Sequence, residues 1–196
     1  MSNWFKILYL PLFLLFTLGN GQEKLTIGEK QNVFSQFLNE NREIWVHLPK
    51  TYSDNTINAA KYPVIYLLDG EINFEYYTGL TDFIARTPYA DIPECIVIGI
   101  QNTERTRDLT PTKAQKKSPV NPDVILFADS GGGENFVKFM QEELKPFINK
   151  NYRTQDYSVL VGHLSEDYLP SIHSFYILII SMLMWRMIPV YGGIIK

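Results

Sequence analysis

Three short runs of apolar residues constrain the fold of this chain more than any other feature of its sequence. They are Tyr62–Leu68, Cys95–Ile100 and Tyr157–Val161. Such runs are typical of strands buried on both faces, as in a parallel or mixed sheet covered by helices. Between them lie helix-like segments, one over Phe74–Arg86 and one that follows Gly131–Gly133. Strands that alternate with helices predict an α/β fold.

Two further segments complete the expected layout. Arg42–Leu48 alternates polar and apolar side chains and ends at Pro49, which predicts a half-buried strand. Gln101–Val120 is polar and longer than most connections in a compact domain. Loops of that length are often functional, so we expect a role in the site for this one.

Polar residues follow each of the three buried strands. These are Asp69–Glu71, Gln101–Asn102 and Gly162–His163. Ligands in open α/β sheets bind beyond the carboxyl ends of the strands, so we expect these residues on one rim. Arg105 and Arg107 come shortly after the second strand. We expect them either to hold an anionic substrate or to lie in an ordinary solvated loop.

The third apolar run leads into the beginning of a nucleophile elbow. In that motif, G-x-S-x-G, a strand turns sharply into a helix and exposes the hydroxyl of the serine. Gly162 and His163 fit the first two positions. Leu164 then occupies the position of the serine, and Ser165 comes one residue late. No catalytic residue is therefore intact by this pattern.

Several ordered segments resemble the esterase family of α/β-hydrolases that includes esterase D and the ferric enterobactin esterases. The resemblance covers about Glu43 to His163. The segments that carry it are Tyr62–Gly70, Asn102–Pro111, Gly131–Gly133, Glu142–Ile148, Asn151–Thr154 and Val161–His163. It implies that residues 22–163 are the N-terminal portion of an α/β-hydrolase domain, with a mostly parallel sheet and flanking helices.

The resemblance also implies a chemistry. Members of the family hydrolyse small-molecule carboxylic esters with a serine nucleophile and need no cofactor or metal. Backbone amides that follow the first buried strand, at Gly70 and Glu71, would contribute to the oxyanion hole. Arg105 and Arg107 would lie in a loop that contacts the substrate. This chain itself is expected to be inactive, because the elbow serine and the downstream acid and histidine are missing.

The N-terminal segment Met1–Gly21 has the features of a secretory signal. Lys6 provides a positive charge, Ile7–Leu18 is apolar, and Gly19–Gly21 offers small residues for cleavage before Gln22. We expect export to the periplasm or the medium. An uncleaved membrane anchor is the alternative.

The C-terminal segment 164–196 has an unusual composition. The last acidic residue is Asp167, and the stretch Phe175–Lys196 is rich in apolar residues. A lost base after codon 163 would explain this tail, because the alternate reading phase can encode the family's elbow sequence, G-H-S-F-G-G. The other interpretation is a genuine apolar tail that anchors a non-catalytic, membrane-associated binding protein.

Charge and cysteine content exclude other classes of protein. The net charge of −3 disfavours nucleic-acid binding by phosphate neutralisation. A lone Cys95 forms neither an intramolecular disulfide nor a thiolate metal site. The sequence leaves the oligomeric state open.

Overall fold

The computed structural model describes residues 25–54, 56, 60–86, 90, 92–114, 117–162 and 176–179. The predicted signal Met1–Gly21 lies outside the described residues, as do His163, Leu164 and Ser165. So does the predicted tail, apart from the backbone of 176–179. Among the described residues, no helix is long and apolar enough to cross a membrane.

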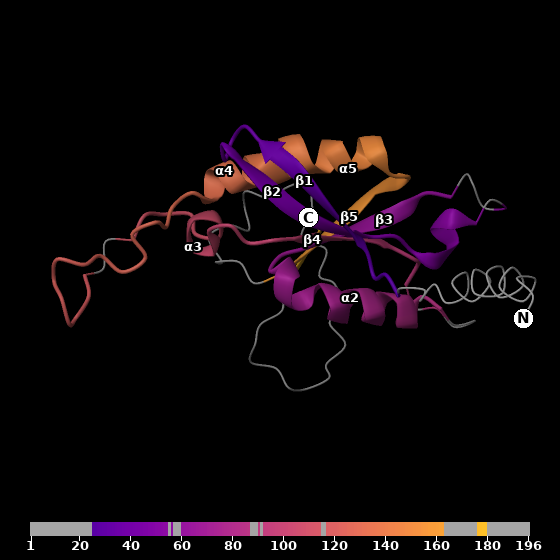
Figure 1. Cartoon of the computed structure of the whole chain (residues 1–196), viewed down its shortest axis with the longest axis horizontal. Helices are drawn as coiled ribbons and strands as arrows, with labels where there is room; N and C mark the ends of the chain where they lie inside the picture. Colours follow the sequence, from indigo (N-terminus) through magenta and orange to yellow (C-terminus); the bar gives the residue numbers. More distant parts are fainter. Residues whose placement is uncertain are drawn as a thin grey trace, which may run out of the picture.

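A mixed sheet forms the centre of the described chain (Figure 1). Its strand order is β1-β2-β4-β3-β5-β6. The pairs β1–β2 and β2–β4 are antiparallel, whereas β4–β3, β3–β5 and β5–β6 are parallel. The strands are β1 (Glu29–Ser35), β2 (Glu40–His47), β3 (Tyr62–Leu67), β4 (Ile96–Ile100), β5 (Thr154–Gly162) and β6 (Tyr176–Ile179).

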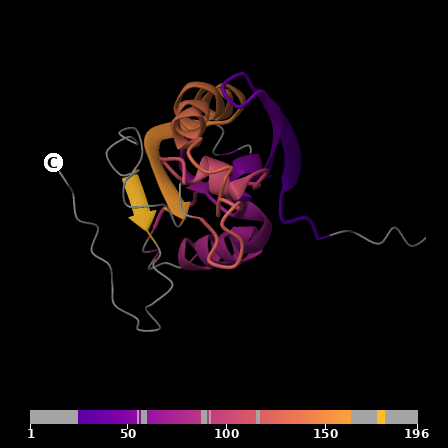
Figure 2. The same cartoon turned by 90° about the vertical axis from the view of Figure 1, so that its left-hand side faces the viewer.

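Helices lie on both faces of this sheet, which confirms the predicted α/β class (Figures 1 and 2). Helix α2 (Gly70–Ile84) covers one face. On the other face, α4 (Gly133–Lys138), the π-helical segment η3 (Phe139–Leu144) and α5 (Lys145–Asn151) follow one another directly. Within the described residues, two short helices lie in connections: η1 (Lys50–Ser53) and α3 (Arg105–Asp108).

Each face of the sheet packs a separate apolar cluster. Towards α4 and α5, the strands contribute Tyr66, Ile98 and Leu160, all nearly inaccessible, which meet Phe139 and Leu144. Each side chain buried in this way contributes about 1.5–3 kcal/mol of transfer free energy. The cluster towards α2 is smaller and consists of Leu67, Phe74, Val97 and Val161.

The predicted strands and helices of the described chain are present, with several differences, and strand β6 (Tyr176–Ile179) was not predicted. Helix α2 begins at Gly70 rather than at Phe74, so the polar residues after β3 form its first turn. The predicted loop 101–120 contains the short helix α3. Strand β1 was not predicted, because Glu29–Ser35 shows neither a continuous apolar run nor a regular alternation.

Candidate functional site

The structure brings the residues that follow β3, β4 and β5 to one rim of the sheet. A pocket of about 400 Å³ opens there. Its floor comes from the ends of β3 and β5, one wall from α2, and another wall from the segment after β4. The lining residues are Leu67, Asp69, Glu71, Ile72, Asn73, Tyr77, Asn102, Arg105, Val161 and Gly162.

Asp69 joins β3 to α2 in a left-handed backbone conformation, with φ 53° and ψ 45°. Few residues other than glycine adopt this region, and such residues gather at functional sites. The Asp69 carboxylate accepts hydrogen bonds from Asn102 Nδ2 at 2.7 Å and from Arg105 Nε at 2.7 Å. Its carbonyl oxygen accepts from the amides of Ile72 and Asn73. These contacts hold the turn in its unusual conformation.

The N-terminus of α2 opens at this rim. Gly70 and Glu71 are its first two residues, so their amide groups have no acceptor within the helix. The helix dipole adds partial positive charge at the same place. Because a Cβ at position 70 would lie 2.8 Å from both the Gly99 carbonyl carbon and the Ile100 nitrogen, only glycine brings α2 this close to β4. The predicted oxyanion role of Gly70 and Glu71 is compatible with this position and stays a prediction.

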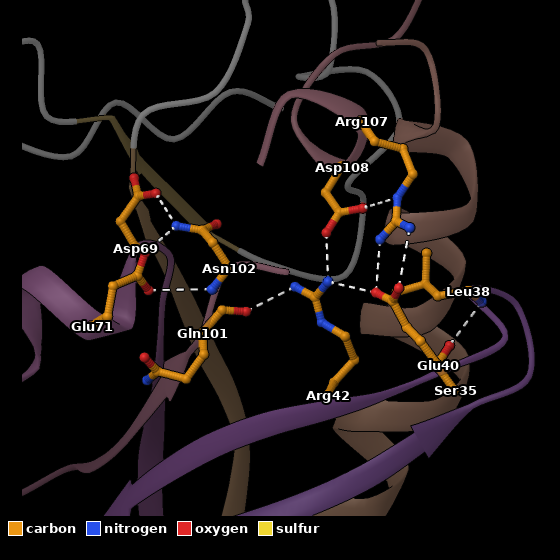
Figure 3. A network of polar contacts seen from close by, with 10 residues as sticks. All are labelled: Ser35, Leu38, Glu40, Arg42, Asp69, Glu71, Gln101, Asn102, Arg107 and Asp108. Atoms are coloured by element: carbon orange, nitrogen blue, oxygen red, sulfur yellow. Dashed lines mark hydrogen bonds and ion pairs between the residues drawn. The ribbon is translucent and has the colours of Figure 1, made fainter. Parts of the chain in front are cut away.

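Asn102 is fixed by two carboxylates. Its Nδ2 group donates to Asp69 and, at 2.5 Å, to Glu71 Oε1, as Figure 3 shows. The backbone amide of Asn102 donates to Glu71 Oε2 at 3.2 Å. Since both neighbours of Nδ2 are acceptors, the orientation of the side-chain amide is determined. Strand β4 and helix α2 are thereby connected at the edge of the pocket.

The two arginines predicted to contact substrate lie in different surroundings. Arg105 lines the pocket, and its side chain is about half exposed (47%) while it pairs with Asp69. The hydrogen bond to Asp69 raises the pKa of Arg105, so the guanidinium stays charged. Arg107 does not line this pocket. It donates to Glu40 and Asp108, and these bonds raise its pKa as well.

A buried network lies behind the rim and was not predicted from the sequence. Arg42 on β2 is 1% exposed; it donates to Asp108 Oδ2 at 2.6 Å, to Glu40 Oε1 at 2.9 Å and to the Gln101 carbonyl oxygen at 2.9 Å (Figure 3). Arg107 completes the network from the other side of Asp108. Arg107 and Asp108 thus attach α3 to β2, through Glu40 and Arg42. This attachment fixes where Arg105 enters the pocket.

Gly162 ends β5 at the floor of the pocket. A Cβ at this position would lie 2.6 Å from the Leu68 Cβ, so the close approach of β5 to the end of β3 requires glycine. The next residues of the chain, where the elbow pattern begins and breaks, lie outside the described residues. The expectation that Ser165 cannot serve as nucleophile therefore stays a prediction.

Comparison with known proteins places this geometry in a family context. Residues 35–164 match the family described as "Putative esterase". The ferri-bacillibactin esterase BesA of Bacillus subtilis (strain 168) is 37% identical over 123 residues, which are 59% of this chain and 42% of that protein. The chain therefore spans less than half the length of this relative.

Solved structures of similar proteins point to the same family as the Bacillus subtilis relative. The crystal structure of an IroE-like serine hydrolase from Shewanella oneidensis is 36% identical with a TM-score of 0.62, over 69% of this chain and 42% of that chain. The BES protein from Bacillus cereus is 27% identical with a TM-score of 0.61, over 74% of this chain and 56% of that chain. The described fold is thus similar to part of a serine hydrolase.

Proposed function

This chain belongs to the Putative esterase family, and from that membership we propose that its described residues form the oxyanion side of a serine ester hydrolase site. One observation carries the proposal: the open N-terminus of α2 and the end of β5 meet in a single pocket, lined by Glu71 and Gly162. In ester hydrolysis the carbonyl oxygen becomes an oxyanion, which backbone amide donors stabilise.

The chemistry proposed for the intact family assigns these residues a defined part. A serine oxygen attacks the acyl carbon, the bond to the alcohol breaks, and the proton passes through a histidine to the leaving alcohol. Water then releases the acid by the same steps. The amides of Gly70 and Glu71 would donate to the oxyanion in both halves. Asp69 would contribute through its backbone conformation, which places the first turn of α2 at the pocket.

We propose further that this chain, as it stands, does not turn over esters. Leu164 occupies the elbow position, and Ser165 is displaced by one residue. A shift of one residue moves the hydroxyl by several ångströms, whereas an error of about 1 Å already costs roughly 100-fold in rate. The purified chain should therefore hydrolyse p-nitrophenyl acetate no faster than buffer. A rate above buffer that Ser165→Ala abolishes would contradict this proposal.

A siderophore ester is the substrate class that we propose, because the relative at 37% identity is a ferri-bacillibactin esterase. Arg105 is placed to contact such a ligand, since it lines the pocket and is half exposed. Quenching of the chain's tryptophan fluorescence by ferri-bacillibactin measures binding without turnover. Arg105→Gln should weaken this binding by about tenfold, the loss of one charged contact of about 1.4 kcal/mol. Equal binding by the variant would exclude Arg105 as a ligand contact.

Export is proposed on the N-terminal sequence. The positive residue Lys6, the apolar run that follows it and the small residues before Gln22 are the features of a cleaved signal. N-terminal sequencing of the protein from its native cells should give a mature chain that begins at Gln22. Recovery of the uncleaved chain from the cytosol would refute export.

A further inference from the structure

A second pocket shares Arg105 with the candidate site but otherwise has different walls. It has a volume of about 390 Å³ and is formed by α3 and by the segment between α3 and α4, which projects beyond the sheet (Figure 1). Among the described residues that line it, Arg105 alone carries a charge, whereas Asp69 and Glu71 line the candidate site. Its walls include Arg105, Thr106, Leu109, Pro111, Phe127 and Ser130.

Gly131 brings the two ends of this segment together. Its φ is 93°, and a Cβ there would lie 2.7 Å from the Lys113 nitrogen, so the close approach requires glycine. The Gly131 amide donates to Thr110 Oγ1 at 2.9 Å, and the Ala114 amide donates to Ser130 Oγ at 2.6 Å. The long loop for which the sequence predicted a role in the site thus forms the walls of a defined pocket.

Phe127 provides an aromatic side chain at this pocket. It is 68% exposed, and its backbone is left-handed with φ 58°, a conformation that bulky residues rarely adopt. Its carbonyl oxygen accepts a hydrogen bond from the Ser130 amide at 3.0 Å, so one turn carries both residues. Residues in such conformations gather at ligand contacts. An exposed phenyl ring beside Leu109 and Pro111 favours contact with another aromatic ring.

Two hydrogen-bond donors at this pocket lack an acceptor within the described chain. Arg105 donates to Asp69 from Nε at 2.7 Å and from Nη2 at 3.1 Å, and its Nη1 donates to no described residue. The Ser130 hydroxyl accepts from Ala114, but it donates its own hydrogen to no described residue, although Ser130 is only 6% exposed. Because one donor is a cation and the described lining contains no acid, the pocket favours an anion.

We propose that this second pocket binds a small aromatic carboxylate. Its carboxylate would accept charge-assisted hydrogen bonds from Arg105 Nη1 and from the Ser130 hydroxyl, and its ring would pack on Phe127. Binding requires neither a nucleophile nor turnover. Phe127 and Ser130 do not line the candidate site, so the test is separate from that of the proposed esterase function.

The test follows the fluorine signal of 4-fluorobenzoate by nuclear magnetic resonance as the intact chain is added. The signal should broaden and shift. 4-Fluorobenzyl alcohol, which has the same ring without the charge, should bind at least tenfold more weakly, and Arg105→Gln should weaken binding of 4-fluorobenzoate by about tenfold. Equal binding of the two compounds, or no binding of 4-fluorobenzoate, would overturn the proposal.

The variant Phe127→Gly separates the role of the ring from that of folding. Glycine adopts a positive φ readily, so this variant should unfold at the same urea concentration as the parent or at a higher one. It should nevertheless bind 4-fluorobenzoate about fivefold more weakly. Val120→Gly, at a 92% exposed position of the same segment outside the pocket, should leave binding unchanged. An unchanged affinity of Phe127→Gly would refute the proposal.

Thiol labelling locates the bound ligand. Burial raises the pKa of the Cys95 thiol to about 11, so this cysteine reacts slowly with iodoacetamide and gives a low background. Thr112 is exposed and lines the pocket, so Thr112→Cys should react quickly alone and slowly with saturating 4-fluorobenzoate. Val120→Cys should react at the same rate in both states. Equal rates of Thr112→Cys with and without the ligand would contradict binding in this pocket.

Discussion

At the scale of single residues, the rim of the pocket depends on backbone geometry as much as on side-chain chemistry. Asp69 adopts a left-handed conformation, and Gly70 next to it makes the close approach of α2 to β4. Asn102, which follows β4, and Arg105, which begins α3, both donate hydrogen bonds to the Asp69 carboxylate. The position of the helix N-terminus is therefore set by polar contacts among residues that line the pocket.

Substitution of Gly70 by alanine should destabilise the protein, because the added Cβ would meet the backbone of β4. Overpacking of this kind costs about 1–3 kcal/mol in the free energy of unfolding. Gly79→Ala, in the same helix, is the matched control, since nothing lies within 4 Å of a Cβ there. Alanine at that position should instead stabilise by about 0.5–1 kcal/mol. Urea denaturation of the two variants gives the comparison, and a stable Gly70→Ala variant would disprove the close approach.

The buried pair Arg42–Asp108 should be the most sensitive polar contact of the described chain. Both side chains are 1% exposed, and removal of one partner leaves an uncompensated buried charge. Asp108→Asn should therefore cost about 3–5 kcal/mol in the free energy of unfolding, measured in urea. Glu134→Gln breaks an exposed pair with Lys138 and should leave stability within error. Similar losses in the two variants would contradict the burial of the Arg42 pair.

Glu40 gives the network a dependence on pH. Its hydrogen bond to Arg107 is the main cause that lowers the pKa of Glu40 below the ordinary value of 4.5. A carboxylate with a lowered pKa in the folded state contributes stability above its ordinary pKa and loses it as pH falls through the folded value. Below about pH 4.5, the free energy of unfolding should therefore fall less steeply with decreasing pH in Glu40→Gln than in the parent. Parallel curves would show that Glu40 does not contribute.

At the scale of elements, the sequence predicts those strands and helices whose apolar residues form a recognisable pattern. Strands β3 and β4 were predicted within a residue or two, because both are buried on two faces. Strand β1 lies at the edge of the sheet and helix α3 has four residues, so neither shows a hydrophobic pattern to read. The first turn of α2 was not predicted as helix, because the apolar helical pattern begins only at Phe74 and Asp69 and Gly70 are common in turns.

The candidate site also has one part that the sequence predicts and one part that it does not. The rim and Arg105 could be predicted, because polar residues directly follow apolar strands. The buried network could not be recognised from residue type, since arginine is rarely buried. One signal was available: Arg42 shares the parity of Ile44 and Val46, the core-facing residues of β2. Its partner Asp108 lies 66 residues away in the chain, and no local pattern connects the two.

Helix α3 has two separate attachments: Arg107 contacts Glu40, and Arg105 contacts Asp69. Arg107→Gln removes the paired contact with Glu40, so amide exchange over residues 105–110 should become faster, as measured by hydrogen–deuterium exchange. Arg105→Gln removes the contact with Asp69 instead and should speed exchange around residues 69–73. The same exchange pattern in both variants would argue against two separate attachments.

At the scale of the whole described fold, the two faces of the sheet differ in completeness. One face carries a continuous stretch from α4 through η3 to α5, which Glu143 also ties to the β1–β2 hairpin through Ser35 and Gln36. The other face carries α2 and a smaller apolar cluster. The sequence predicted the fold class but not this asymmetry, because exposure depends on what packs beside an element rather than on the element's own residues.

The asymmetry should be visible in dye binding. 8-Anilinonaphthalene-1-sulfonate fluoresces when it binds exposed apolar surface. The exposed side chains of Ile72, Tyr76, Leu80 and Phe83, which lie on one side of α2, offer such a surface. Replacement of both Tyr76 and Phe83 by glutamate should reduce the fluorescence without loss of the circular dichroism spectrum. Replacement of Glu75 by glutamine serves as the control. Unchanged dye binding in the double variant would place the exposed apolar surface elsewhere.

The strand order also determines when the sheet can close during synthesis. Strand β3 lies between β4 and β5, and both of these partners come later in the chain. At about 5–20 residues per second, the ribosome needs roughly 5–20 seconds to proceed from Leu67 to Gly162. Throughout that interval one edge of the apolar strand β3 has no partner. A nascent chain of this topology is therefore a natural client for holding chaperones until Gly162 has left the exit tunnel.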